Sequence, residues 1–189
     1  MTTSIDLGRP VSGDVVELIL DDHRRFEELL RDLRDSSSDR DGVRQAFAAL
    51  HVAHALAEEK LVYPKLRRKG AVGEHESEHG EEEHAEGNEA LLAVLELTGT
   101  DTQAFDDAVE GRATAVNHRL PKKELTILNP AREEVGEQVR AELGEQFAAE
   151  RNRQLDDDCG SLTNVRRIVA AARREGLLDE DADDDADEG

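Results

Sequence analysis

The chain is 189 residues long, which suits one domain with extensions. Its 45 acidic and 24 basic residues give a formal net charge of −21, which repels polyanions and argues against a nucleic-acid or anionic-membrane partner. The single cysteine cannot form an internal disulfide, which fits a reducing cytoplasm. The N-terminus lacks an apolar signal core, and no run approaches the ~18 apolar residues of a membrane span, so we expect a cytoplasmic protein.

Apolar residues recur at helical spacing and almost never alternate as they do in strands, which predicts an all-α fold. A first helix is expected from a cap at Ser12 to the turn at residues 36–38, with His23 in its apolar stripe. A second helix is expected after residues 41–42 and ends near Gly70, with basic residues in its last turn.

The Gly-, Glu- and His-rich stretch 70–83 is interpreted as a loop, which leads into a third helix carrying His84. A fourth helix is expected from about Asp101 to the region of His118. Short connections between four helices favour antiparallel neighbours. We therefore predict an up-down-up-down four-helix bundle over residues 12–132.

The segments outside this bundle are expected to differ in order. Residues 1–11 form an N-terminal arm, and residues 133–178 form an extension of two further helices with a regular apolar face. That face either caps the bundle or forms a homodimer. Residues 179–189 include eight acidic residues among eleven and no apolar anchor, so we expect a disordered acidic tail.

The candidate site begins with His54 and Glu58, which point the same way because they are four residues apart on a helix. Apolar neighbours share their face, and a buried ionisable group must be paired or bound to metal. Each of the four bundle helices places one histidine near its apolar stripe, and these are His23, His54, His84 and His118. Histidine and carboxylate from facing helices build two-metal sites in bundles. Imidazole and carboxylate ligands without thiolates suit iron, zinc or manganese, and iron is our first choice.

At these residues the chain resembles the hemerythrin-like (HHE cation-binding) family. The matching segments, over residues 15–132, are Asp22-His23 with Leu29-Leu30, His54-Ala-Leu-Ala-Glu58-Glu59-Lys-Leu-Val-Tyr63-Pro64, Glu83-His84 with Leu91-Leu92, and His118 with a late Pro130. The resemblance implies a four-helix bundle that holds a non-haem di-iron centre by histidine and bridging carboxylate side chains. It also implies a protein that carries, stores or senses dioxygen, responds to nitric oxide or peroxide, or handles iron.

The fourth helix departs from the family's pattern, which has a second His-x-x-x-Glu. His118 is followed at that spacing by Lys122, whereas counting back from Pro130 places the carboxylate at Glu124. His118 and Glu124 share a face only if the helix breaks between them, as Pro121 can cause. Three outcomes stay open: an irregular but complete site, a site reduced to one metal, and a bundle without metal.

The predicted metal ligands are therefore His23, His54, Glu58, His84, His118 and Glu124. The expected ligand at the metal is a small diatomic molecule or peroxide, and binding or sensing is favoured over enzymatic turnover because few acid–base groups accompany Glu58 and Tyr63. The alternative is a degenerate bundle, with one metal or none, that acts as a structural or interaction protein. His51 would serve as a hydrogen-bonding neighbour of the site or face its boundary.

Overall fold

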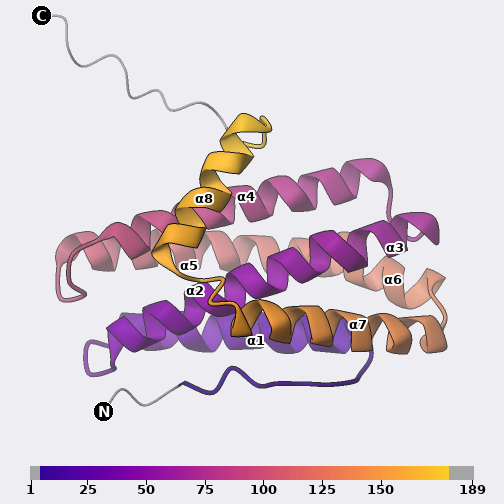
Figure 1. Ribbon diagram of the computed structural model, residues 1–189, viewed down its shortest axis with the longest axis horizontal. Helices are drawn as coiled ribbons and strands as arrows, with labels where there is room; N and C mark the ends of the chain where they lie inside the picture. The colour runs from indigo at the N-terminus through magenta and orange to yellow at the C-terminus, as the bar shows by residue number, and fades with distance from the viewer. Residues whose placement is uncertain (1–4, 179–189) are drawn as a thin grey trace, which may run out of the picture.

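The computed structural model describes residues 5–178, and within this range the regular structure is helical, without strands. The prediction of an all-helical fold is confirmed. Successive segments join into six continuous rods (Figure 1). These are α1 (Val15–Arg34), α2 (Arg40–Ala57) with η1 (Glu58–Val62) and α3 (Tyr63–Arg68), α4 (Glu74–Glu96), α5 (Gln103–Lys123) with η2 (Glu124–Leu128) and α6 (Asn129–Glu134), α7 (Glu137–Asp156), and α8 (Leu162–Arg174).

The first four rods enclose a common apolar core. Helix α1 packs against α2 and α5, and α4 packs against the same two helices on the other side. Side chains of all four rods meet in the middle, among them the fully buried Leu29, Leu50 and Phe105. This closed arrangement brings residues from four distant parts of the sequence to one place.

The start of α4 differs from the expectation of a loop over residues 70–83. The helix begins at Glu74, after an extended Gly73, so most of that stretch is helical. Glutamate has a high helix propensity, and acidic residues in a first turn are stabilised by the helix dipole. Tyr63 packs closely against this helix at Gly80, where a Cβ atom would lie 2.7 Å from the tyrosine hydroxyl oxygen, and this explains the glycine.

Two π-helical turns interrupt the second and fourth rods at matching places. Each begins at a glutamate, Glu58 or Glu124, and each is followed by a proline, Pro64 or Pro130. The residue before each proline donates its backbone N–H to that glutamate's carbonyl, five residues back. The wider turn accommodates a proline, whose ring clashes with the carbonyl four residues before it in a regular helix. By contrast, α5 continues through Pro121, so the break that we considered there is absent.

The C-terminal extension packs on the first four rods. Helix α7 lies along α1 and α2, and α8 crosses α4 (Figure 1). Helix α7 lies so close to the segment just before α1 that a Cβ atom on Gly144 would be 1.8 Å from the carbonyl oxygen of Gly13. The apolar face that we considered for a dimer thus contacts the same chain, through residues such as Phe147 and Val165. The predicted acidic tail lies outside the described residues, and no helix within them combines the length and apolarity needed to cross a membrane.

Candidate metal centre

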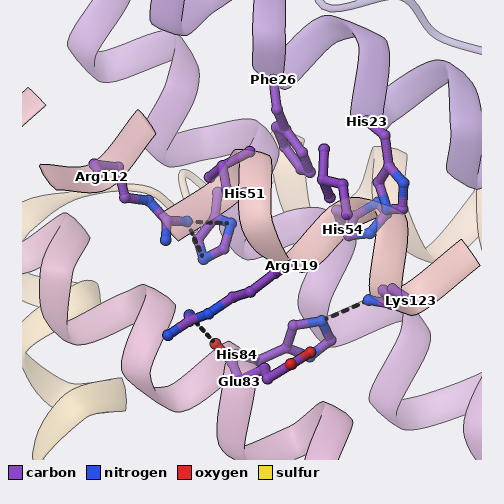
Figure 2. Close-up of a pocket in the computed structure, with 11 residues that line it drawn as sticks. His23, Phe26, His51, His54, Glu83, His84, Arg112, Arg119 and Lys123 are labelled. Carbon is purple, nitrogen blue, oxygen red and sulfur yellow. Dashed lines mark hydrogen bonds between the residues drawn. The ribbon is translucent and has the colours of Figure 1, made fainter. Parts of the chain in front are cut away.

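Four of the six predicted ligands lie together in the interior. His23 comes from α1, His54 and Glu58 from the junction of α2 with η1, and His84 from α4. All four are buried, and the side chain of Glu58 is 0% exposed. The three histidines border a cavity of about 50 Å³ between α1, α2, α4 and α5 (Figure 2). The fold therefore brings these residues to one site.

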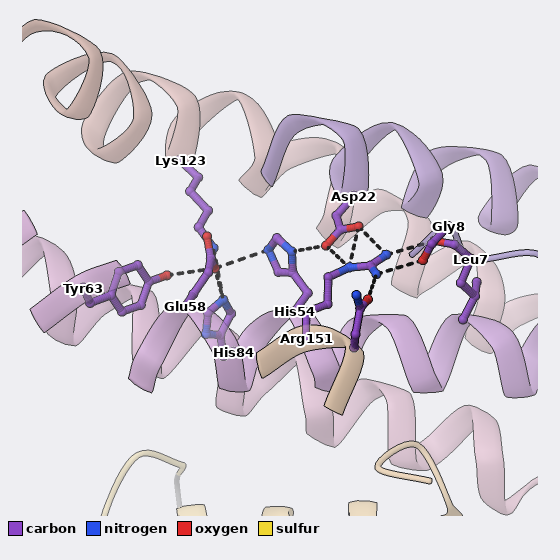
Figure 3. A network of polar contacts seen from close by, with 10 residues as sticks. Leu7, Gly8, Asp22, His54, Glu58, Tyr63, His84, Lys123 and Arg151 are labelled. Carbon is purple, nitrogen blue, oxygen red and sulfur yellow. Dashed lines mark hydrogen bonds and ion pairs between the residues drawn. The ribbon is translucent and has the colours of Figure 1, made fainter. Parts of the chain in front are cut away.

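One oxygen of Glu58, Oε2, is the point on which the polar groups converge (Figure 3). The Nε2 atoms of His54 and His84 lie 3.3 and 3.1 Å from it. The hydroxyl of Tyr63 donates to the same oxygen at 3.3 Å. The ammonium group of Lys123, at the end of α5, also donates to it and, at 3.0 Å, to Nε2 of His84. A buried carboxylate and a histidine thus share one cation.

Two further carboxylates orient the histidine rings. Nδ1 of His54 lies 3.0 Å from Oδ2 of Asp22, and Nδ1 of His84 lies 2.8 Å from Oε1 of Glu59. An ionised carboxylate only accepts, so a neutral ring bonded in this way carries its proton on Nδ1. The Nε2 atom of each ring then faces Glu58. Histidines that bind metal in proteins are held by carboxylates in this manner.

Several polar atoms of this cluster have no hydrogen-bond partner. They are both ring nitrogens of His23, Nε2 of His54 and Oε1 of Glu58. The rings of Phe26 and Phe147 pack edge-on against His54, with centroids 5.2 and 5.8 Å away, and limit the access of water. Since buried polar atoms are nearly always paired, these atoms mark a place for a ligand or an ion.

The cluster sets the charges of its members. Burial would raise the pKa of Glu58, but Lys123 and His54 hold this pKa well below its usual range. Burial would lower the pKa of His54, but Glu58 and Asp22 raise it above the ordinary value. Burial and the neighbouring His54 hold the pKa of His23 well below the ordinary value. At neutral pH the site contains an ionised Glu58 beside a neutral His23, which are the forms that bind metal.

The C-terminal extension reaches the site through Arg151 of α7. Its guanidinium donates to both carboxylate oxygens of Asp22 at 2.8 to 3.0 Å, and it is 2% exposed. Asp22 in turn accepts from His54, so the line of contacts in Figure 3 runs from α7 to the cluster. Sequence reasoning missed Arg151, although it follows the buried Phe147 by one helical turn and so shares its inward face.

The structure does not bring His118 and Glu124 to this site. Both are exposed, and neither borders the cavity. Glu124 begins a π-helical turn as Glu58 does, but the inward position on the fourth rod belongs to Lys123, one residue earlier. One residue turns a helical side chain by about 100°. Lys123 could have been recognised from the sequence, because the apolar stripe through Leu120 reaches it at helical spacing.

The fourth rod departs from the family's pattern, but this departure does not change the family relationship. A family model described as the hemerythrin HHE cation-binding domain matches residues 14–130. The chain belongs to this family. The resemblance drawn from the sequence is thus confirmed, and the HHE domain is a cation-binding, all-helical domain. No curated protein and no solved structure matches the chain.

The donors present do not fit the two-metal centre that the HHE family implies. The part of α5 that borders the cavity presents neither histidine nor carboxylate, but Arg112, Val116, Arg119, Leu120 and Lys123. In the described range 5–178, no three His, Cys, Asp or Glu side chains stand as they would around a metal ion. The reason lies in the contacts of Lys123, whose ammonium group takes the space between Glu58 and His84. The unpaired atoms of His23, His54 and Glu58 are the donors left for a single cation, which would have to displace this ammonium group.

Proposed function

We propose that this chain binds a single iron ion through His23, His54, Glu58 and His84, and that it binds dioxygen, nitric oxide or peroxide there. The observation that carries the proposal is the paired orientation of two histidines. Asp22 and Glu59 accept hydrogen bonds from the two Nδ1 atoms, so both Nε2 atoms face the one ionised carboxylate of Glu58. Three imidazoles and a carboxylate suit iron. The buried Cys159 lies elsewhere and donates a hydrogen bond to the carbonyl oxygen of Ala49.

A bound iron ion would supply an open coordination position with redox activity. The chain's own residues would do the rest. Asp22 and Arg151 fix the ring of His54, while Phe26 keeps water away from it. Burial and Glu58 raise the pKa of Tyr63 well above its ordinary value, so its hydroxyl stays protonated and donates to Glu58.

The proposal includes one metal rather than two because of Lys123. Its ammonium group already contacts Glu58 and His84 from the side on which a second metal would need ligands from α5. A positive charge there neutralises the carboxylate as a second cation would. His118 and Glu124 are left out of the ligand set because they are exposed.

Metal content tests this proposal. The full chain, purified without a histidine tag, would be reconstituted with ferrous iron under anaerobic conditions, and iron per chain would be measured by elemental analysis. We expect one iron per chain, and optical changes on adding nitric oxide. Two irons with the near-ultraviolet bands of an oxo-bridged ferric pair would overturn the single-metal proposal.

Matched variants locate the metal. His84→Ala and Glu58→Gln should remove iron, whereas His118→Ala and Glu124→Gln should retain it, because the latter two residues are exposed. Loss of iron from the surface variants, with retention by the buried ones, would move the site to another part of the protein.

A second function is favoured by the same lysine. Lys123 already satisfies the charge of Glu58, so the cluster is electrostatically complete without metal. On this hypothesis the protein is a metal-free helical domain that acts through contacts with a partner. The absence of bound iron after anaerobic reconstitution, in a chain that remains folded, would favour this second function.

A further inference from the structure

Arg112, on α5, differs from the other buried basic residues in the part of the chain that the structure describes. Its exposed fraction is 5%, yet no carboxylate or carbonyl oxygen accepts a hydrogen bond from it. The others each have a carboxylate partner: Arg40 with Asp106, Arg44 with Asp41, Lys123 with Glu58, and Arg151 with Asp22. Arg112 therefore carries a buried charge that the protein itself does not neutralise.

The contacts of Arg112 are those of a stacked cation. Nη2 lies 3.2 and 3.3 Å from the two ring nitrogens of His51, and one N–H cannot align well with both. The guanidinium carbon lies 5.5 Å from the ring centroid of Phe47, and Nε has no partner. The fold holds the guanidinium in place but leaves part of its donor capacity unused.

Arg112 borders the cavity beside the candidate metal centre. Figure 2 shows Arg112 at one end of this cavity, with His23 and Lys123 at the other. Two other charged groups on the lining have partners within the protein. Arg119 pairs with Glu86, and the carboxylate of Glu83 lies 3.3 Å from Nε2 of His79.

The charge persists at neutral pH. Burial, with a contribution from the nearby Arg119, lowers the pKa of Arg112 to about 9, so the group remains ionised at pH 7. A buried ionised group is expected to be paired, because desolvation of an isolated charge is strongly unfavourable. His51 offers no compensating charge, since burial and Arg112 hold its pKa well below the ordinary value.

We propose that this cavity binds a small monovalent anion with two coplanar acceptor oxygens, such as formate or nitrite, on the guanidinium of Arg112. The planar fork of arginine matches two coplanar oxygens. A single unpaired positive charge favours a monoanion over phosphate or sulfate. A cavity of about 50 Å³, walled partly by Phe26, Val116 and Leu120, also favours an ion of a few atoms that is weakly hydrated. The site does not depend on a bound metal.

Formate binding to the metal-free full chain tests the proposal. Protein treated with a chelator would be titrated with carbon-13 formate at constant ionic strength and followed by NMR. The affinity of a ligand of only three heavy atoms is limited by its size, so we expect saturable binding at one site with a dissociation constant of about 1 mM or weaker. Arg112→Met should weaken binding at least tenfold. Arg166→Met removes an exposed arginine of α8 and should leave binding unchanged.

Thermal unfolding separates this role from a purely structural one. Without formate, Arg112→Met should unfold at the same temperature as the unmodified protein or higher, because a buried unpaired charge has been removed. Formate should raise the unfolding temperature of the unmodified protein but not of the variant. Should the methionine variant fail to fold, Arg112→Lys keeps the charge without the fork and should bind formate several-fold more weakly. The absence of saturable formate binding, or equal binding by the variants, would overturn the proposal.

Discussion

Replacing Lys123 by methionine would leave the fully buried carboxylate of Glu58 without its cation. Removal of one partner of a buried ion pair costs about 3–5 kcal/mol, because the other charge stays desolvated. Tyr63 and the two histidines at 3.1 and 3.3 Å would still contact the carboxylate, which favours the lower end of this range. In a protein of this length the loss corresponds to a fall in melting temperature of roughly 6–20 °C.

The assay is urea unfolding of the metal-free chain at pH 7.5, as a double-mutant cycle. Lys123→Met with Glu58→Gln should cost less than the two single changes added together, because the double variant leaves no buried charge, and we expect a coupling of about 2 kcal/mol. Lys122→Met is the matched control, since this neighbouring lysine is exposed and should change stability by less than about 0.5 kcal/mol. If the two lysine variants are equally stable, Lys123 does not neutralise Glu58 and the reasoning is refuted.

Three further predictions concern stability. Arg151→Gln should cost about 3 kcal/mol in denaturant unfolding, because Asp22 is buried with it, and a loss below about 1 kcal/mol would contradict this pairing. Because the pKa of His51 is lowered in the folded state, the unfolded state binds a proton on this residue more readily, and stability should fall as the pH drops below about 6.5. His51→Gln should reduce the slope of unfolding free energy against pH by up to about 1.4 kcal/mol per pH unit. An unchanged slope in urea unfolding would assign the acid sensitivity to other groups. Gly144→Ala should destabilise by about 2 kcal/mol or more, whereas Gly111→Ala, in open space on α5, should be neutral or stabilising, and equal melting temperatures would refute the close approach of α7.

The all-helical fold and the proximity of His54 to Glu58 could be predicted because both follow from local spacing. His54 and Glu58 are on one rod, and their four-residue separation alone places them on one face. His23 and His84 were identified in the same way, each from the apolar stripe of its own helix. The partners that orient them are harder to predict, since Asp22 and Arg151 meet across 129 positions of sequence. Only the packing of α7 on α1 makes that contact.

The fourth rod shows a different limit of predicting site residues from the sequence. Two alignments to the family pattern predicted His118 or Glu124 as ligands, and both depended on the spacing of residue types rather than on the direction of the apolar stripe. The stripe decides which side chains point inward, and it reaches Lys123. Matching a motif by residue type therefore selected two exposed residues, whereas the apolar stripe selects the buried Lys123.

The π-helical turns of the second and fourth rods have the same backbone pattern. A glutamate opens each turn and a proline follows six residues later, so the backbone feature is present at both half-sites. Only the turn beginning at Glu58 carries a buried carboxylate, because Glu124 is exposed. The two rods thus share this backbone geometry but differ in the burial of the glutamate, and Lys123 supplies the cation that Glu58 requires. A buried carboxylate needs a compensating charge, and here Lys123 supplies it from the rod on which the glutamate that opens the π-helical turn is exposed.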